Sequence, residues 1–267
     1  MADEPFAPER RGILRLLWGM IVRPRSTLEY LNEHGKRAWW VPALLGLLLV
    51  LLPILVAAPI TARQSREAFI AAQEQMGERF GGQQDPAQME RAMSIATNPL
   101  IITVFPAVAA VLGRIAGWLV WAGVLYLAGM ALGGRTTYGA LFRTVVWAWL
   151  PYALRGLLQT IYIAASGQLI ANPGLSGLVK QPQSVGEMFV APPNTGQMLC
   201  AAGLAQVDLF LVWNLILLII GVTVTTRLST RKAALITLGV WLLLTALSLI
   251  PTLVSSLFMG SVGIVSP

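Results

Sequence analysis

The sequence predicts an all-α integral membrane protein: a five-helix transmembrane bundle with a cytoplasmic N-terminus, an outside C-terminus, an amphipathic N-terminal helix and a helical outer loop. Hydrophobic residues make up 56% of the 267 residues and charged residues only 12%, which leaves too little polar surface to cover a soluble globule. Five stretches have the roughly 20 apolar residues that a helix needs to cross the hydrocarbon core. The lysines and arginines lie at the ends of these stretches, so the net charge of +7 indicates membrane topology and no nucleic-acid binding.

Residues 1–38 are the predicted cytoplasmic segment, ahead of a five-span membrane domain over residues 39–267. Apolar residues from Ile13 to Val22 stand beside Arg10, Arg11 and Arg15, an arrangement suited to a helix lying on anionic lipid. Pro24 ends this helix, and a short helix then leads toward the first span. Because arginines interrupt each apolar stretch, no cleavable signal peptide is expected.

Spans one and two are predicted at about residues 39–62 and 106–132. Between Pro99 and Leu132 the only charge is Arg114, yet this stretch is too long for one straight crossing. Either residues 99–105 lie in the interface and the crossing starts near Pro106, or the segment forms a hairpin around Arg114. We favour one kinked span because Gly113-Arg114-Ile115 is a poor turn.

Spans three, four and five are predicted at about residues 138–165, 207–226 and 233–259. With this arrangement, 12 of the 19 lysines and arginines lie on the side of the N-terminus and five on the other side. This bias places the N-terminus in the cytoplasm.

Two outer loops connect the spans, at residues 63–98 and 167–203. The first contains two predicted polar helices, Gln64 to Phe80 and Pro86 to Ala96, with Asp85 as the N-cap of the second. The second loop is rich in Pro, Gly, Asn and Gln and is predicted to be irregular.

Three charges fall within predicted spans, namely Arg114, Arg155 and Asp208, and all lie in the outer half of the bundle. Charges in a bilayer usually face the bundle interior and find partners, so we expect Asp208 to pair with Arg155, Arg114 or both. Such a polar centre could bind an anionic headgroup, a substrate or a partner; alternatively, the ion pair only fixes helix registry or the arginines snorkel to the surface. Asn214 is expected to bond another helix or to line a polar cavity with Gln159.

Small residues recur at intervals of four on span two. Ala109, Gly113 and Gly117 form one such face, and Gly129 with Gly133 repeats the spacing. These faces let helices approach closely, either within the bundle or between copies of the chain.

No residue is predicted to be catalytic, to bind a cofactor or to bind a metal. The sequence lacks HExxH, GxSxG and P-loop motifs. Cys200 and His34 are the single cysteine and histidine, which excludes an intrachain disulfide and a Cys/His zinc cluster. The sequence assigns no role to Cys200.

Several short segments resemble, in order, those of the Yip (Ypt-interacting protein) family of five-span membrane proteins. They are Arg23-Pro24-Arg25-Ser26-Thr27-Leu28-Glu29-Tyr30-Leu31, Gly133-Gly134-Arg135-Thr136-Thr137-Tyr138, Leu150-Pro151-Tyr152, Asp208-Leu209-Phe210-Leu211-Val212-Trp213 and Leu228-Ser229-Thr230-Arg231-Lys232-Ala233. The resemblance implies a cytoplasmic N-terminus and a non-enzymatic role. Eukaryotic relatives serve vesicle trafficking and bind Rab-type GTPases through a longer N-terminal region. This chain is more similar to the bacterial branch, and some members of that branch associate with ABC-type export systems.

Together these features predict a multi-pass protein of a bacterial cytoplasmic membrane. We expect it to act as a non-catalytic accessory or scaffold for a partner membrane complex. The candidate partner that the resemblance implies is an ABC-type export system. One alternative is a small-solute or lipid transporter or channel that uses the polar residues of the outer half. Another is a trafficking factor that binds a small GTPase. The expected partners are the lipid bilayer and another membrane protein, which includes a second copy of the chain.

Overall fold

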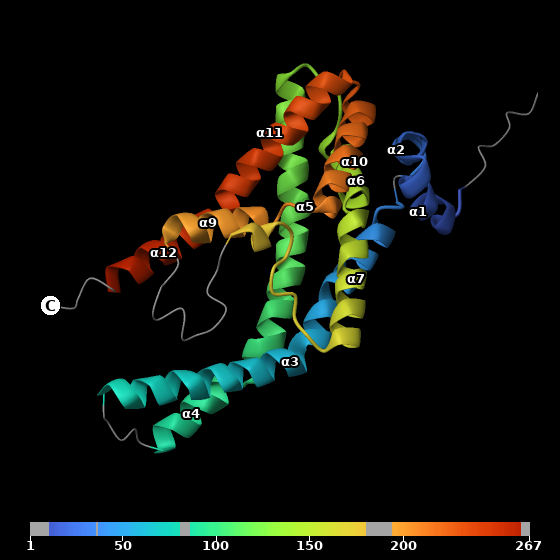
Figure 1. The fold of residues 1–267 in the computed structure, drawn as a ribbon. Helices are drawn as coiled ribbons and strands as arrows, with labels where there is room; N and C mark the ends of the chain where they lie inside the picture. Colours follow the sequence, from blue (N-terminus) through green and yellow to red (C-terminus); the bar gives the residue numbers. More distant parts are fainter. Residues whose placement is uncertain (1–10, 36, 81–85, 180–193, 263–267) are drawn as a thin grey trace, which may run out of the picture.

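The computed structural model describes residues 11–35, 37–80, 86–179 and 194–262, and within these ranges it contains helices but no strands. Figure 1 shows their arrangement. In chain order the elements are α1 (Ile13–Val22), α2 (Pro24–Glu33), α3 (Trp40–Phe80), α4 (Pro86–Ala96), the π-helix η1 (Leu100–Val104), α5 (Phe105–Ala131), α6 (Tyr138–Ala148), α7 (Leu150–Ser166), the 3-10 helix η2 (Ser176–Leu178), α9 (Thr195–Leu204), α10 (Leu209–Thr226), α11 (Thr230–Ser248) and α12 (Ile250–Val262).

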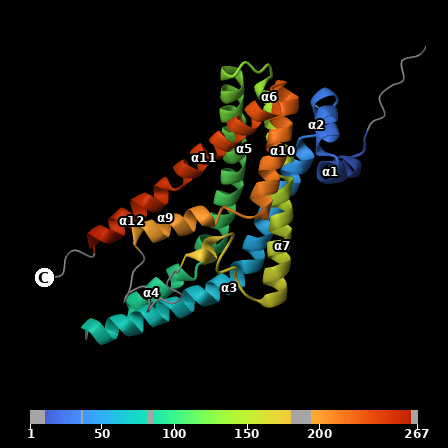
Figure 2. The ribbon, with the colours of Figure 1, turned by 45° about the horizontal axis from the view of Figure 1, so that its top comes forward.

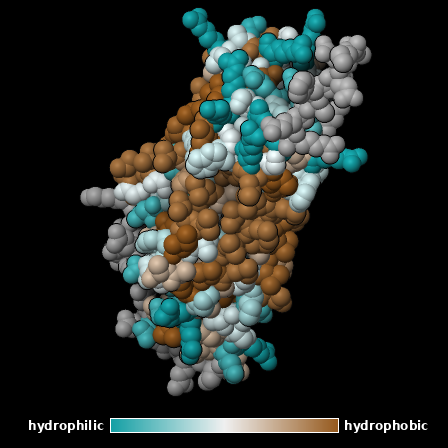
Figure 3. Space-filling model, turned by 90° about the vertical axis from the view of Figure 1, so that its right-hand side faces the viewer, coloured by the Kyte–Doolittle hydropathy of each residue, from teal (hydrophilic) through white to brown (hydrophobic). Residues whose placement is uncertain are grey.

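The protein is a multi-pass membrane protein. Within the described residues, four helical stretches are long and apolar enough to cross a membrane, at Trp40–Glu74, Ala87–Ala131, Leu209–Thr226 and Thr230–Ser256. A broad apolar band separates two polar ends on the face shown in Figure 3. The predicted third span, residues 138–165, is divided into α6 and α7, so the count of five spans and their orientation stay predictions.

Span two is one helix, because α5 runs through Arg114 without a break. The alternative of a hairpin around Arg114 is therefore wrong. Pro106 is the second residue of α5, and because proline has no N–H it cannot continue the hydrogen-bond ladder of the helical turn before it. The wide turn of η1 precedes it.

The helix of span one extends well beyond the predicted crossing. The sequence suggests one helix to about Ala62 and another from Gln64 to Phe80, but α3 is continuous from Trp40 to Phe80. Arg63 marks a change in polarity and not a helix end, because the Arg, Gln, Glu and Ala residues that follow are good helix formers. The bounds predicted for α4 are confirmed, whereas its predicted cap Asp85 lies outside the described residues.

Part of the second outer loop is helical, contrary to the prediction of an irregular segment. Asn194 and Gln197 form a capping box at the start of α9, with each side chain bound to the other residue's backbone N–H. This pair satisfies two amide groups that a helix start leaves without partners. Cys200 is exposed on α9 and unpaired.

Two long apolar segments are interrupted just before a proline. Trp149 separates α6 from α7, and Pro151 lies in the first turn of α7. In the same way Leu249 separates α11 from α12, which contains Pro251 as its second residue. Proline lacks the N–H of the helix ladder and its ring clashes with the preceding turn, so each helix restarts at this point.

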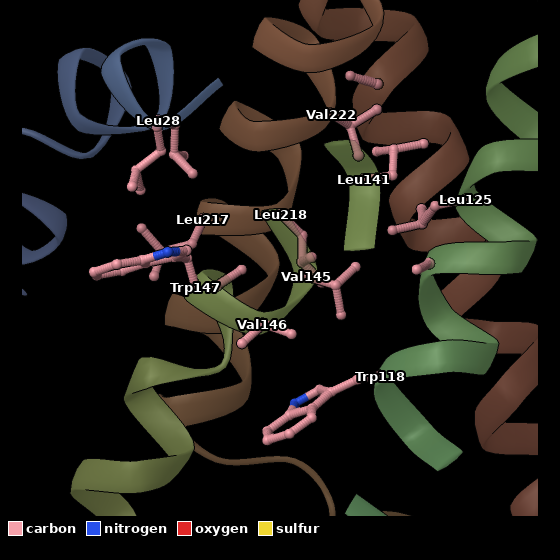
Figure 4. Close-up of a cluster of buried hydrophobic side chains, with 14 of the residues drawn as sticks. Leu28, Trp118, Leu125, Leu141, Val145, Val146, Trp147, Leu217, Leu218 and Val222 are labelled. Atoms are coloured by element: carbon pink, nitrogen blue, oxygen red, sulfur yellow. The ribbon is translucent and has the colours of Figure 1, made fainter. Parts of the chain in front are cut away.

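The core lies where α6 packs against α10, with α2 and α5 on either side (Figure 4). Gly221 of α10 permits this close packing, because a Cβ atom there would overlap the side chain of Thr144 on α6. The hydroxyls of Thr144 and Thr225 are hydrogen bonded at 2.9 Å in the same interface. Met20 of α1 and Leu28 of α2 are fully or almost fully buried in this cluster, so the N-terminal helices are part of the core.

The basic connections lie at one end of the molecule. The N–H of Arg135, after α5, donates to the carbonyl of Thr226 at the end of α10 (3.1 Å), and Lys232 Nζ donates to the carbonyl of Leu132 (3.3 Å). The far half of α3 and α4 project from the opposite end (Figure 1), and α11 and α12 diverge from α5 (Figure 2).

Candidate functional site

Helix α7 places three polar side chains on one face. Tyr152, Arg155 and Gln159 follow one another at intervals of three and four residues, which align along one side of a helix. All three are half-buried. This face therefore borders other helices and could exchange polar contacts with them.

Asp208 begins α10. Its backbone is extended, and its Oδ1 atom accepts a hydrogen bond from the N–H of Leu211 at 2.8 Å. This is the standard N-cap arrangement, which satisfies one amide of the first turn. The negative charge also lies at the positive end of the helix dipole, where it stabilises the first turn of α10.

The other carboxylate oxygen of Asp208 binds Arg155. The distance from Arg155 Nη1 to Asp208 Oδ2 is 2.9 Å, and the side chains are 22% and 15% exposed, respectively. The structure thus joins α7 to the start of α10 through a largely shielded ion pair. Removing one partner would leave the other charge poorly solvated, which is costly in such surroundings.

Arg114 does not share this carboxylate but contacts Tyr152. Its guanidinium carbon lies 5.8 Å from the centre of the Tyr152 ring, which is within the range of a cation–π contact. Tyr152 also lies beside Trp149, with ring centres 5.8 Å apart. The sequence pattern named Tyr152 only within the family-like segment Leu150-Pro151-Tyr152 and not as a member of the polar cluster, although its position three residues before Arg155 places it on the same helix face.

Asn214 lies apart from the ion pair and has a structural role at the break between α6 and α7. Its Nδ2 atom donates to the carbonyl of Ala148 at 2.7 Å, and the side chain is 1% exposed. In a continuous helix this carbonyl would accept the N–H of Tyr152, which here donates to Trp149. Asn214 therefore supplies a donor that the interrupted helix lacks. Of the two expected roles, the structure shows the interhelical bond.

The small residues of α5 fall into two environments. No atom of the described residues lies within 4 Å of the Cβ position that a side chain would take at Gly113 or Gly117, and Ala109 on the same face is exposed. A Cβ atom at Gly129, in contrast, would lie 3.4 Å from the side chain of Thr226 on α10. Gly133 adopts a positive φ of 83° after the helix, a conformation that favours glycine.

The polar cluster is suited to binding and registry but not to proton transfer. Asp208 is its only acid, and both carboxylate oxygens are engaged, one with Leu211 and one with Arg155. Among the described residues, no group of three His, Cys, Asp or Glu side chains could hold a metal ion. What the site offers is two guanidinium groups, Arg114 and Arg155, held on neighbouring helices.

A family model described as "Yip1 domain" matches residues 18–261. This match covers most of the chain, including α2 to α11 and the residues of the polar cluster. No curated protein and no solved structure matches the chain.

Proposed function

We propose that this chain, which belongs to the Yip1 domain family, is a non-catalytic accessory or scaffold protein that packs against a partner membrane complex. The observation that carries the proposal is the open small-residue face of α5, formed by Ala109, Gly113 and Gly117. Small residues in membrane helices allow another helix to approach closely. Within the described part of the chain, no helix makes that approach at Gly113 or Gly117.

The partner that the family resemblance suggests is an ABC-type export system in a bacterial cytoplasmic membrane. This is an argument from family analogy. The packing of α1 and α2 onto the core supports it over a trafficking role, because these helices bury Met20 and Leu28 against the rest of the protein. A second candidate, a small-solute or lipid transporter, rests on Arg114 and on the Arg155–Asp208 pair.

The α5 face is tested by the double variant Gly113→Leu/Gly117→Leu, with Gly239→Leu as the matched control. Gly239 on α11 is equally open, but its neighbours four residues away are Leu235 and Leu243. The full chain is purified from native membranes in mild detergent, and co-purifying membrane proteins are quantified by mass spectrometry. We expect a stoichiometric partner that is reduced about tenfold with the double variant, since a lost close helix contact is worth roughly 1–2 kcal/mol.

Three outcomes would contradict the proposal. The partner could remain bound to the double variant, or it could be lost equally from the control. The wild-type chain could also prove to be a lone protein that moves a solute in liposomes, which would favour the transporter. Retention of the wild-type thermal midpoint shows that the double variant is folded, and we expect it because a Cβ atom at Gly113 or Gly117 would meet no atom of the described residues within 4 Å.

A further inference from the structure

The α1–α2 hairpin contains a basic cavity. The two helices are joined at Arg23, and between them lies a cavity of about 290 Å³ whose lining includes Arg11, Arg15, Arg23, Ser26 and Trp18. No acidic side chain of the described residues is among those that line it. Three guanidinium groups around one cavity create a local positive field suited to a phosphate group.

The cavity is held in shape by contacts of its own. Arg11 Nη1 lies 3.4 Å from the carbonyl oxygen of Ser26, its guanidinium lies 4.8 Å from the centre of the Tyr30 ring, and its backbone N–H donates to the Tyr30 hydroxyl. Behind the cavity, Leu16 and Met20 anchor α1 in the core. A preorganised site of this kind loses little conformational entropy when it binds a ligand.

An apolar groove lies on the adjacent face of α1. It has a volume of about 370 Å³ and is bounded by α1, α3, α7 and Trp213, with Leu45, Leu49, Leu154 and Leu157 among its lining residues. Trp18 of α1 lines both this groove and the basic cavity. The side of the molecule that carries α1 and α2 faces the viewer in Figure 3, where polar side chains meet the apolar band.

We propose that the cavity and the groove together bind one anionic phospholipid. Its phosphate is held by Arg11, Arg15 and Arg23, and one acyl chain occupies the groove below Trp18. The basic cavity complements the charge of the phosphate, and the adjacent apolar groove accommodates an acyl chain. A free phosphate would fill only the cavity and leave the groove empty. The groove uses the same stretch of α7 as the polar cluster but none of the polar cluster's residues, and the inference is independent of the proposed function.

The test measures lipid retention by native mass spectrometry. The full chain, purified in neutral detergent, is titrated in parallel with phosphatidylglycerol, phosphatidylcholine and inorganic phosphate. We expect one retained phosphatidylglycerol and far less phosphatidylcholine. In the variant Arg15→Gln/Arg23→Gln, phosphatidylglycerol affinity should fall roughly 30-fold, or about fivefold for each arginine, which is the usual effect of a basic residue near anionic lipid.

Two further variants separate the headgroup site from general charge and from the groove. Arg25→Gln is the matched control, because Arg25 lies in the same segment but pairs with Glu29 at 3.1 Å and does not line the cavity. It should bind phosphatidylglycerol like the wild type. Leu154→Trp fills the groove and should weaken retention without removing a charge.

The proposal is overturned if phosphatidylcholine is retained as well as phosphatidylglycerol, or if Arg25→Gln loses as much affinity as the double variant. It is also overturned if inorganic phosphate alone binds the arginines and Leu154→Trp changes nothing, since the site would then hold a free anion. Arg15 and Arg23 are exposed, and the thermal midpoint of each variant without lipid is measured beside its lipid affinity, so that a loss of folding is distinguished from a loss of binding. The single variants provide the same comparison if the double variant does not fold.

Discussion

The energetic value of the Arg155–Asp208 pair can be measured without disturbing the start of α10. Asp208→Asn removes the charge but keeps a side-chain oxygen for the N–H of Leu211, because Asn and Asp are equally good N-caps. Breaking a buried ion pair costs about 3–5 kcal/mol and an exposed one about 0.2–1 kcal/mol. With side chains 22% and 15% exposed, we expect Asp208→Asn to lower the free energy of unfolding by about 2 kcal/mol.

Arg155→Gln should cost less, about 1 kcal/mol, because Asp208 would still be stabilised by the N-terminus of α10. In the double variant Asp208→Asn/Arg155→Gln, neither charge is left unpaired, so the two costs should not add. We expect a coupling free energy of about 1–2 kcal/mol. The assay is the unfolding of the full chain by dodecyl sulfate in mixed micelles, followed by tryptophan fluorescence.

Asp208→Ala provides the control, since it removes both the ion pair and the cap and should cost about 1 kcal/mol more than Asp208→Asn. Exchanging the two charges is a poorer test, because an arginine at residue 208 could not cap α10 and would oppose its dipole. Strictly additive costs of the two neutral variants would refute the reasoning, since they would show that the 2.9 Å contact contributes no pairwise stability.

Two further predictions concern packing between helices. Asn214→Leu leaves the carbonyl of Ala148 without its donor and should lower the free energy of unfolding by about 1–3 kcal/mol. An unchanged unfolding midpoint would contradict the role of Asn214 as the donor at the break between α6 and α7. Gly156→Ala would place a Cβ atom against the backbone carbonyl of Leu49, so α3 and α7 must separate, and we expect a loss of about 1–3 kcal/mol. Gly113→Ala is the comparison in the same micelle assay, because its Cβ atom would meet nothing within 4 Å in the described part of the chain. Equal effects at both glycines would refute the packing argument.

Local signals in the sequence predicted those parts of the fold that depend on few residues. The bounds of α4, predicted from a capping residue and a proline at the helix start, match the structure. The fourth span, predicted at about residues 207–226, closely matches α10. The capping box at Asn194 and Gln197 is a similar local signal, but the Gly and Pro content of the loop favours an irregular segment, and the start of α9 was not predicted.

Interruptions within apolar segments were harder to predict. A test of length and hydropathy treats α6 and α7 as one span, because Trp149, Leu150 and Pro151 are all apolar or neutral. Whether a proline kinks a membrane helix or ends it depends on what satisfies the freed carbonyl. Here the donor is Asn214, 66 residues further along the chain, and no local pattern connects the two positions.

The candidate site was predicted in its charges but not in its connections. Asp208, Arg155 and Arg114 were identified because intramembrane charge is costly, but the choice between the two arginines depends on how the helices pack. α7 turns Arg155 toward α10 and Tyr152 toward Arg114 of α5. The open face at Gly113 also depends on packing, since its spacing alone is equally compatible with a contact inside the bundle.

The contacts of α10 indicate which part of the molecule is rigid and which part could respond to a partner. α10 is bound at its start to Arg155, in its first half to the carbonyl of Ala148, and near its end to Thr144 and Arg135. Because α1 and α2 are buried against this same unit, the basic cavity has a fixed position relative to the polar cluster. The first half of α11 belongs to the core through Ala233, Ile236 and Val240, whereas its second half and α12 diverge from α5 (Figure 2). The small-residue face of α5 is open. A partner helix that packs on α5 would therefore meet a preformed surface, and any adjustment on binding should occur in the second half of α11 and in α12 and leave the lipid site unchanged.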